Sequence, residues 1–365
     1  MMRAKFILIF LISCINSLCK AQKKNGAMYC NGYKKLCRVP YNKVAFPATH
    51  NSYAVSRNFF VANQHRKIPE QLNDGIRVFM IDAHSKKVGM TKLIRGLFKR
   101  DSIPLTNIQL CHGNCGILDA GKMMDVLIVF KQFLDQNPHE IVTIMIENFH
   151  GFTSTEIYSN FLHSGLDRYL FNPTMYPNIQ EEWPTLRQLI ETDQRLVLFS
   201  SIIANDTRIP QVMEEAQYIA QTSYRVEHRR KQNFQTGFDC ALNPPSRPKP
   251  LVVLNHFVLD TINIFGFKIQ VSTPKGSNKV NKEQSILDHY QTCRDAKIFP
   301  NFITVDFHNN QELFSAIASI NKVSYVDPYN RTFDATSHSS TNLPPVKKIH
   351  NLLLLLAVSL LSFTA

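Results

Sequence analysis

The sequence contains no internal repeat and no long low-complexity tract, and its composition is that of a globular protein rather than a disordered one. Its basic residues are not interleaved with aromatic ones in a recognisable nucleic-acid-binding module, so we expect no nucleic-acid partner. Acidic residues are few, because 28 Asp and Glu stand against 41 Lys and Arg, and the formal net charge is +13. A basic chain of this kind favours anionic partners such as acidic lipid headgroups.

Neither apolar end of the chain is long enough to span a bilayer comfortably. A basic start, an apolar run over residues 6–19 and small residues after it predict a signal peptide over 1–21. At the other end, a small polar stretch, a polar spacer and the uncharged apolar run 352–365 have the order of a glycosylphosphatidylinositol (GPI) attachment signal, with the attachment site within 337–340. The alternatives are an uncleaved anchor and a short tail anchor. We expect a secreted, cell-surface protein with one domain over 22–330 and a linker and attachment signal over 331–365.

Six of the eight cysteines lie outside the predicted signal peptide. Six cysteines allow fifteen connectivities. Closeness in the sequence suggests Cys30–Cys37 and Cys111–Cys115, which leaves Cys240–Cys293. Glycosylation sequons begin at Asn205 and Asn330 and are expected on surface loops.

Apolar runs that look like strands alternate with segments of helical periodicity. We predict strands near 43–49, 75–82, 107–111, 141–147, 196–200, 251–256 and 302–307. We predict helices near 64–73, 121–136, 154–164, 184–191, 210–231, 282–292 and 310–322. This alternation indicates an α/β fold with a parallel sheet, and the number of units predicts a single-domain, TIM-type (β/α) barrel. Because seven strands are found instead of eight, the barrel is irregular or one strand is missed.

Polar side chains stand at the ends of these predicted strands. The residues concerned are His50, Asp82, His112, Glu147, Asn148, Asn255 and Asp306. The carboxyl ends of the strands of a parallel barrel converge on one face, so we expect these side chains to meet there. Two imidazoles across a pocket can divide proton transfer, because one takes a proton from an attacking hydroxyl and the other gives one to a leaving oxygen. The pattern predicts phosphodiester cleavage by His50 and His112.

These motifs resemble the X domain of phosphatidylinositol-specific phospholipase C, most closely its secreted, plant-type group. The matching segments are Ala48-Thr49-His50-Asn51-Ser52-Tyr53, Gly75-Ile76-Arg77 running to Asp82, Leu110-Cys111-His112-Gly113, and Glu140-Ile141-Val142-Thr143 running to Glu147-Asn148. The plant-type group similarly has paired N-terminal cysteines and segments like Asn255-His256-Phe257 and Pro300-Asn301-Phe302. The resemblance covers roughly residues 28–325.

The resemblance implies a reaction and a substrate class. His50 would take the proton of the inositol 2-hydroxyl, and His112 would protonate the diacylglycerol oxygen. The product would be a cyclic inositol phosphate, cut from a phosphatidylinositol-type anionic membrane lipid at the membrane surface. Asn148, Asn255 and Asp306 are expected to contact the substrate.

The resemblance also implies a divalent cation, with calcium favoured, held by Asn51, Asp82 and Glu147. Met80 stands where the calcium-dependent members carry a glutamate. Calcium normally takes six or more oxygens, so waters and the substrate phosphate would have to complete the shell. The alternative is that Asp82 and Glu147 orient the histidines or bind the inositol without a metal.

Several other interpretations remain open at this point. Cys111, His112 and Cys115 could bind zinc, although an oxidising compartment favours the disulfide. Residues 90–100 form a basic amphipathic pattern that fits either a membrane surface or ordinary packing on the barrel. The function could instead be cleavage of a lysophospholipid or sphingomyelin headgroup, or headgroup binding without turnover.

Overall fold

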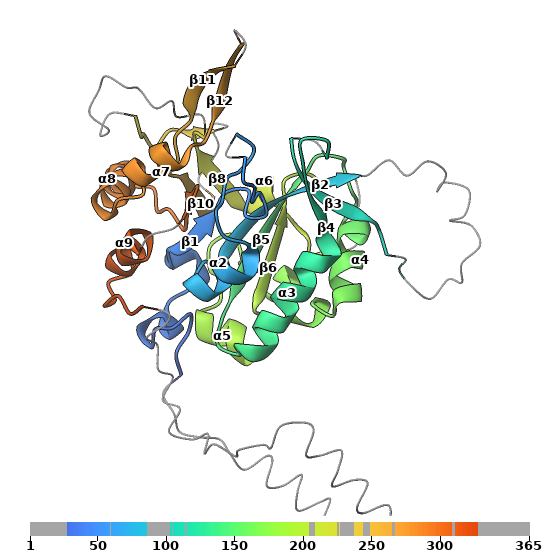
Figure 1. The fold of residues 1–365 in the computed structure, drawn as a ribbon. Coiled ribbons are helices and arrows are strands. Elements are labelled where there is room, and N and C mark those ends of the chain that lie inside the picture. The colour runs from blue at the N-terminus through green and yellow to red at the C-terminus, as the bar shows by residue number, and fades with distance from the viewer. Residues whose placement is uncertain are drawn as a thin grey trace, which may run out of the picture. The chain divides into compact units, whose positions relative to one another are not determined.

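Figure 1 shows the computed structural model, which describes residues 28–58, 60–85, 103, 105–113, 115–203, 209–224, 226, 237–243, 249–264, 267–308 and 311–327. The predicted signal peptide, the attachment signal, both sequons and the amphipathic pattern at 90–100 lie outside these residues. The described residues all belong to one compact unit, so the single domain is confirmed. None of the helices in them has the length and apolar character that crossing a membrane requires.

Eight parallel strands form the central sheet, and they follow one another around it in chain order. They are β1 (Phe46–Thr49), β2 (Val78–Ser85), β5 (Val142–Asn148), β6 (Leu196–Ser200), β7 (Met213–Glu214), β8 (Ile219–Thr222), β10 (Leu251–Asn255) and β13 (Phe302–Val305). β1 pairs with both β2 and β13, so the first and last of these strands lie side by side. Within the described residues no ladder joins β7 to β8, and the ring is open there. The predicted irregular α/β barrel is therefore confirmed.

Helices surround the strands, with α2 to α5 on one side of Figure 1 and α7 to α9 on the other. The helices are α2 (Ile68–Asp74), α3 (Met123–Gln136), α4 (Ser154–Ser164), α5 (Leu186–Glu191), α6 (Glu215–Tyr218), α7 (Pro274–Val280), α8 (Glu283–Asp295) and α9 (Glu312–Ile320), with the short 3-10 helices η1 (Lys35–Arg38), η2 (Tyr41–Lys43), η3 (Asp167–Tyr169) and η4 (Pro173–Met175). Local signals fix their ends: Thr153 caps α4 by accepting from Glu156 N, and Gly165 ends it in the left-handed conformation.

Side-chain alternation along the strands divides the apolar residues between two cores. On β2, Val78 belongs to the core inside the barrel, while Phe79 and Ile81 belong to the core under the helices. On β10, Val253 lies inside and Leu254 lies under the helices. Because side chains repeat every two residues, the inward positions beyond the apolar layers fall on the polar residues that end the strands.

One predicted barrel strand is wrong. Residues 107–111 form β3 (Ile108–His112), which runs antiparallel to β2 and continues through a hairpin into β4 (Leu118–Lys122). β2 continues past the level of the barrel, and β3 folds back along this extension, with Ser85 opposite Ile108. The apolar alternation is the same in a hairpin strand as in a barrel strand, so the sequence did not distinguish them.

The predicted helix over 210–231 is also wrong for most of its length. Its described residues contain β7, the four-residue α6 and β8, so two barrel strands lie where a helix was expected. Strands of two and four residues are too short for alternation to be visible. The remaining strands are β9 (Leu242–Asn243), antiparallel to β8, and the hairpin of β11 (Asp260–Ile264) and β12 (Phe267–Val271), which projects from the top in Figure 1.

All three predicted disulfides are confirmed: Cys30–Cys37, Cys111–Cys115 and Cys240–Cys293. The second closes a short loop directly after β3, which removes the zinc alternative because both cysteines are bonded to each other. The third ties residue 240 to α8.

Candidate functional site

His50 follows β1 directly, at the mouth of the barrel. Its backbone N–H donates to Val305 O at 3.1 Å, and its carbonyl accepts from Gln64 Nε2 at 2.8 Å. The chain then turns through Asn51, a non-glycine residue with φ of 43°. These contacts with β13 and with the loop after β1 fix the position of the imidazole.

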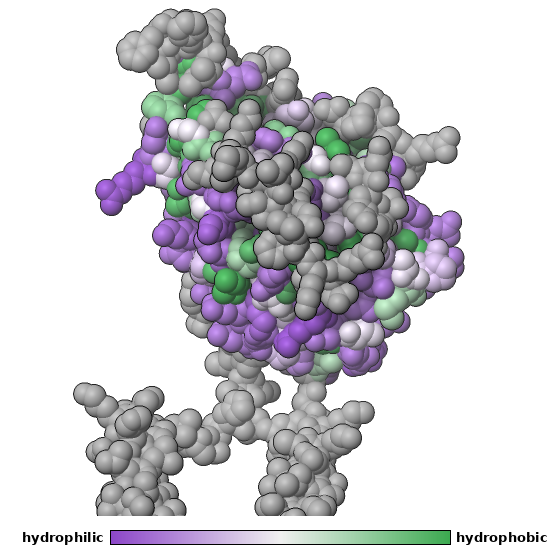
Figure 2. Space-filling view, turned by 90° about the vertical axis from the view of Figure 1, so that its right-hand side faces the viewer, coloured by the Kyte–Doolittle hydropathy of each residue, from purple (hydrophilic) through white to green (hydrophobic). Residues whose placement is uncertain are grey.

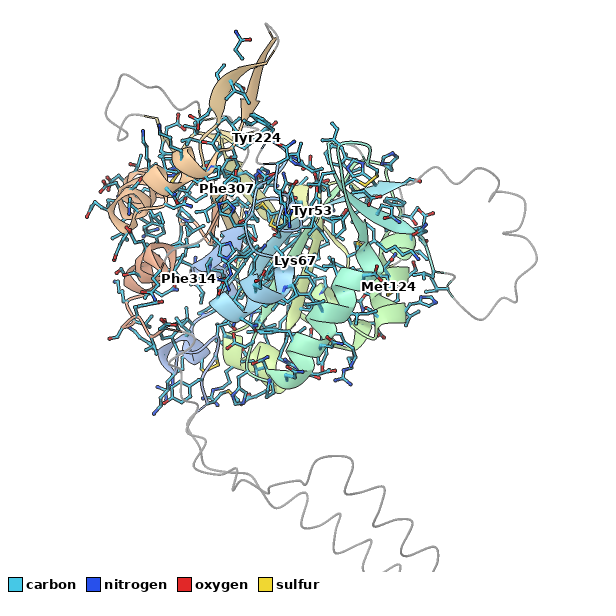
Figure 3. The ribbon with its side chains drawn as sticks, in the orientation of Figure 1. Tyr53, Lys67, Met124, Tyr224, Phe307 and Phe314 are labelled. Atoms are coloured by element: carbon cyan, nitrogen blue, oxygen red, sulfur yellow. A yellow bond between two sulfur atoms is a disulfide. The ribbon has the colours of Figure 1, made fainter. Side chains whose placement is uncertain are left out.

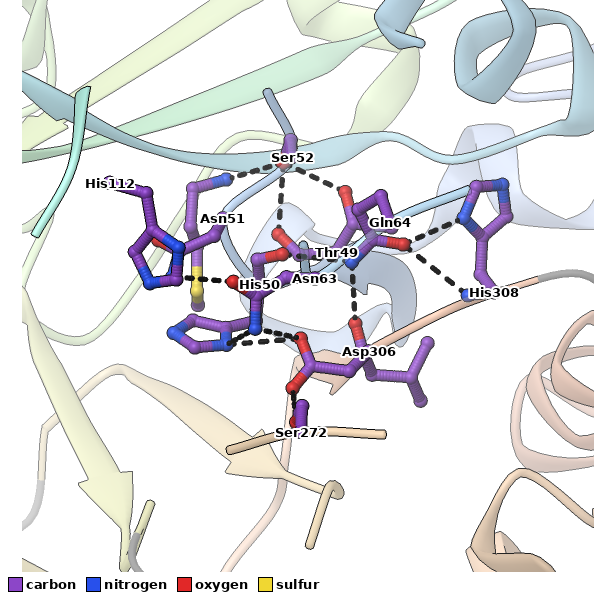
Figure 4. A network of polar contacts seen from close by, with 12 residues as sticks. Thr49, His50, Asn51, Ser52, Asn63, Gln64, His112, Ser272, Asp306 and His308 are labelled. Atoms are coloured by element: carbon purple, nitrogen blue, oxygen red, sulfur yellow. Dashed lines mark hydrogen bonds and ion pairs between the residues drawn. The ribbon is translucent and has the colours of Figure 1, made fainter. Parts of the chain in front are cut away.

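Asp306 lies directly behind the His50 ring. Its Oδ1 accepts from His50 Nδ1 at 3.0 Å and from Asn63 Nδ2 at 3.2 Å, and its Oδ2 accepts from Ser272 (Figure 4). The Asp306 side chain is completely buried, whereas that of His50 is 28% exposed. The ring of Phe257 stacks on His50 with a centroid distance of 4.5 Å. With Nδ1 bonded to the carboxylate, Nε2 is the nitrogen of His50 left for the mouth.

The surroundings of His50 favour its protonated form. Burial acts to lower its pKa, but the charge and hydrogen bond of Asp306, with the charges of Asp82 and Glu147, outweigh burial and raise the pKa above its usual value. All three carboxylates that the sequence predicted at the mouth therefore act electrostatically on the His50 imidazole.

His112 ends β3 and reaches the same mouth from the hairpin. Its Nδ1 lies 2.9 Å from Val61 O, a carbonyl that can only accept, so Nδ1 carries the proton. Burial lowers its pKa, the bond to Val61 opposes this, and the charge on His50 lowers it further. The adjoining carbonyl of Cys111 accepts from Tyr53 Oη at 2.9 Å. His112 thus presents its Nε2, within electrostatic range of His50, and Figure 4 shows the two rings close together.

Asp82 and Glu147 form the acidic side of the mouth. They are direct partners in the register of β2 and β5. The pKa of Asp82 is raised to about 7, because burial and the charge on Glu147 outweigh the opposing effects of Tyr53 and His50. The pKa of Glu147 is also raised, by desolvation, although its side chain remains accessible from the mouth. Two such carboxyls side by side are costly to ionise unless a cation joins them.

The donor set fits a hard divalent cation. Asn51 donates its amide nitrogen to Asn63 Oδ1 at 3.2 Å, which leaves its carbonyl oxygen as a possible ligand beside Asp82 and Glu147. Oxygens of this kind are what calcium and magnesium prefer. No group of three or more His, Cys, Asp and Glu among the described residues is placed to hold a metal alone. Met80 pairs with Met145 one layer below, so this position adds no oxygen.

The three predicted substrate-binding residues, Asn148, Asn255 and Asp306, have hydrogen-bond partners within the protein. Asn148 Nδ2 donates to Phe152 O and Ile202 O, both at 2.8 Å. Asn255 Nδ2 donates to Thr222 O at 2.8 Å and to a neighbouring amide at 3.3 Å.

All three side chains are buried, and Asp306 uses both carboxylate oxygens within the protein. Each of them is already bonded by a neighbouring strand or loop, and the expected substrate contacts stay predictions.

Several residues of the mouth were missed in the sequence. Asn63 lies in the loop that follows His50 and Ser272 lies far from His50 along the chain, and no pattern distinguishes them from other short polar residues. Glu215 was missed because its segment was predicted as a helix. Burial raises the pKa of the Glu215 carboxyl to about 7, with a contribution from the charge on Glu147. β7 has only two residues and Glu215 already begins α6, so no strand pattern in the sequence could have placed this carboxyl.

The phosphatidylinositol-specific phospholipase C X-domain family model, PI-PLC X, matches residues 36–321. A PI-PLC X domain-containing protein 1 from Arthroderma benhamiae is 28% identical over 302 residues, which cover 80% of this chain and 90% of the relative. An uncharacterized secreted protein from the same fungus is 28% identical over 306 residues, which cover 81% of this chain and 64% of the relative. The chain thus spans just under two thirds of the length of that secreted protein.

Two solved structures with a similar arrangement are bacterial enzymes. The phosphatidylinositol-specific phospholipase C from Listeria monocytogenes is 17% identical, with a TM-score of 0.49, and covers 77% of this chain and 94% of its own. A mutant of the phosphatidylinositol-specific phospholipase C from Staphylococcus aureus is 14% identical, also with a TM-score of 0.49, and covers 78% and 94% of the two chains.

Proposed function

The chain belongs to the phosphatidylinositol-specific phospholipase C X-domain family, and from this premise we propose that it is a phosphodiesterase that cleaves a phosphatidylinositol-type phospholipid. The observation that carries the proposal is the placement of His50 and His112. They come from β1 and from the β3 hairpin, both stand at the barrel mouth, and each is within the electrostatic range of the other. Such a pair suits one phosphorus atom between two proton-transfer groups.

His50 is the proposed base. Asp306 holds the Nδ1 proton, so Nε2 accepts the proton of the attacking hydroxyl, and Asp306 stabilises the imidazolium that forms. A ring hydroxyl next to the phosphodiester then forms the new P–O bond as the bond to the diacylglycerol oxygen breaks.

His112 is the proposed acid. It must carry a proton on Nε2 to protonate the leaving oxygen, whereas its surroundings lower its pKa. A bound phosphodiester adds a negative charge next to His112 and so favours the imidazolium. A lowered pKa also makes the imidazolium of His112 give up its proton more easily, as a general acid must do in the transition state.

The acidic side of the mouth supports a metal requirement. Asp82 and Glu147, with the oxygen of Asn51, would hold a divalent cation, and calcium is the favoured ion. When bound, such a cation supplies positive charge to the phosphate oxygens. Neutralising the two carboxylates would also remove two of the charges that raise the pKa of His50, which favours the neutral form that a base requires.

The rim of the mouth supports a membrane substrate. Large apolar side chains are exposed on loops after five strands: Phe60, Ile117, Phe149, Ile202 and Tyr224. Tyr224 lies in the upper part of the molecule in Figure 3, as do Tyr53 and Phe307. Elsewhere, the described side chains on the face in Figure 2 are largely hydrophilic, with scattered hydrophobic ones. Apolar groups around the mouth would allow it to sit on a lipid surface.

The chain is proposed to act outside the cell. Three disulfides are typical of an oxidising compartment, and a fungal relative is described as secreted. Cleavage of the signal peptide, glycosylation at Asn205 and Asn330 and replacement of the C-terminal tail by a GPI anchor remain proposals from the sequence alone. Release of the protein from cells by a bacterial phospholipase would test the anchor.

Product analysis tests the function. Secreted protein is incubated with vesicles containing inositol-labelled phosphatidylinositol, with Ca²⁺ or with EDTA, and the water-soluble products are separated. We expect a cyclic inositol phosphate that is formed with Ca²⁺ and lost with EDTA.

Three histidine variants accompany the wild type. His50→Ala and His112→Ala should be inactive, whereas His163→Ala, on the outer helix α4, should retain activity. Equal background release by wild type and His50→Ala would favour a headgroup-binding protein without turnover. Cleavage of lysophosphatidylcholine or sphingomyelin in place of phosphatidylinositol would favour a different headgroup.

A further inference from the structure

Phe257 is a large buried side chain that belongs to neither apolar core of the barrel. It is 2% exposed, yet among the described residues it is part of neither the core inside the barrel nor the core under the helices. Its ring stacks instead on the imidazole of His50, with a centroid distance of 4.5 Å and an angle of 1° between the two planes. Packing of an apolar core therefore does not account for this ring.

Three neighbouring strands bring this ring and the proposed base together. β13 pairs with β1 on one side and with β10 on the other. His50 follows β1, Asp306 follows β13, and Phe257 lies two residues after β10. The phenyl ring and the imidazole thus meet across the end of β13, where Asp306 bonds His50 Nδ1 at 3.0 Å. The base, its carboxylate and its stacked ring come from three adjacent strand ends.

The backbone that carries Phe257 is fixed by the buried residue before it, His256. The His256 backbone N–H donates to Thr304 O on β13 at 2.8 Å, and its Nε2 donates to Val280 O at 2.8 Å. Its Nδ1 lies 2.9 Å from Nδ1 of His289 on α8. With the preceding residue bonded to a barrel strand and to the helix layer, Phe257 forms a firm wall at the mouth.

We propose that Phe257 is a positioning residue that sets the plane of the His50 imidazole and so aims its Nε2 at the proton that it accepts. The bond from Nδ1 to Asp306 holds one edge of the imidazole but leaves the ring free to tilt about that bond. A flat ring stacked on one face opposes this tilt, and a phenyl group offers no donor or acceptor that would compete with Asp306.

The consequence of a tilt would appear in the rate. Nε2 lies on the far side of the imidazole from the bonded edge, so it moves most when the ring tilts. Misplacement of a reacting group by about 1 Å can cost about 10²-fold in rate. The expected effect on rate rests on the proposed function, because it assumes that His50 is the base.

Kinetics on phosphatidylinositol vesicles and NMR of the His50 ring test the inference. Phe257→Leu keeps an apolar side chain but removes the flat face, and Phe257→Tyr keeps the face. Phe130→Leu is the matched control, because Phe130 is also completely buried and packs against another ring, that of Phe79, but lies on the outer helix α3. The His50 signals are recorded on protein with ¹³C-labelled histidine and assigned by their loss in His50→Ala. Thermal unfolding checks that each variant is folded.

We expect Phe257→Leu to lower kcat by about 10–100-fold and to leave KM within about twofold, since the ring touches the base and not the substrate. The ring current of the phenyl face should shift the C–H signals of the His50 ring upfield in wild type, and Phe257→Leu should move them downfield. Phe257→Tyr should keep both the rate and the shift. Phe130→Leu should lose stability and change neither.

A folded Phe257→Leu variant with kcat within about threefold of wild type would overturn the inference. So would His50 signals that do not move in this variant, or an equal fall in kcat in Phe130→Leu. If wild type has no phosphodiesterase activity while the His50 signals still move in Phe257→Leu and not in Phe130→Leu, the proposed function fails and the orientation of His50 by Phe257 stands.

Discussion

Replacing Asp306 by Asn tests whether His50 acts as a base held by a buried carboxylate. The substitution keeps the size of the side chain and can keep an oxygen for His50 Nδ1 and Asn63 Nδ2, with its amide nitrogen toward Ser272. It removes the negative charge that outweighs the effect of burial on His50. The pKa of His50 should therefore fall, and the imidazolium formed during the reaction loses its counter-charge.

The size of the effect follows from these contacts. The equivalent Asp→Asn change behind a catalytic histidine in serine proteases lowers kcat by about 10⁴ while leaving the geometry intact. Asp306 is similarly buried and bonded, so we expect kcat to fall by about 10²–10⁴, which corresponds to roughly 3–5 kcal/mol of activation free energy. The stability of the fold should change by only about 1 kcal/mol, because the hydrogen bonds can be remade.

The assay is the pH dependence of kcat on phosphatidylinositol, with thermal unfolding as the check on folding. In the wild type, activity should rise with pH as His50 loses its proton, and Asp306→Asn should shift this acidic limb to lower pH while lowering its plateau. Asp260→Asn is the matched control. Asp260 begins β11, and its carboxylate accepts a hydrogen bond from the hydroxyl of Thr273, just as that of Asp306 accepts from Ser272. A kcat within threefold of wild type, or an acidic limb that does not move, would refute the role given to Asp306.

Three further predictions concern charge. Asp82→Asn should abolish Ca²⁺-dependent activity and weaken Ca²⁺ binding measured by calorimetry, and unchanged Ca²⁺ affinity would contradict the metal site. His256 and His289 are buried with pKa values lowered to about 3 and about 4 by desolvation, so the unfolded chain binds more protons than the folded one between pH 6.5 and these values. The free energy of unfolding should fall on acidification in this window, by about 1.4 kcal/mol per pH unit for each histidine. Urea titrations that give the same free energy of unfolding at every pH in the window would contradict this prediction. Arg77→Met leaves Glu140 as an unpaired buried charge, because Arg77 Nε donates to its carboxylate at 2.7 Å, and should cost about 3–5 kcal/mol in denaturant unfolding; a loss below about 1 kcal/mol would argue against the pair.

Local features of the sequence were sufficient for much of the fold. α4 was predicted over the residues that it occupies, and in the structure Thr153 and Gly165 form its two ends. Alternation puts Arg77, just before β2, on the opposite face from Asp82, and Arg77 is bonded to Glu140. The three disulfides agreed with closeness along the chain.

The residues of the candidate site could be predicted from the sequence only in part. His50 and His112 were found because each ends an apolar run, yet His112 arrives from an antiparallel hairpin rather than from a barrel strand. Its place near the mouth depends on how far β2 extends before β3 folds back along it. The internal partners of Asn255 and Asp306 could not be predicted, because they lie on neighbouring strands and loops.

The sequence by itself determined most of the helices, most of the barrel strands and the polar groups that end them, since periodicity and alternation act between residues a few positions apart. Only the tertiary structure decided that Asp306 stands behind His50, that Asn148 and Asn255 are already bonded, and that Glu215 lies within electrostatic range of Glu147. The partner of a polar side chain depends on which distant segment packs next to it, and that is set by the closure of the whole barrel.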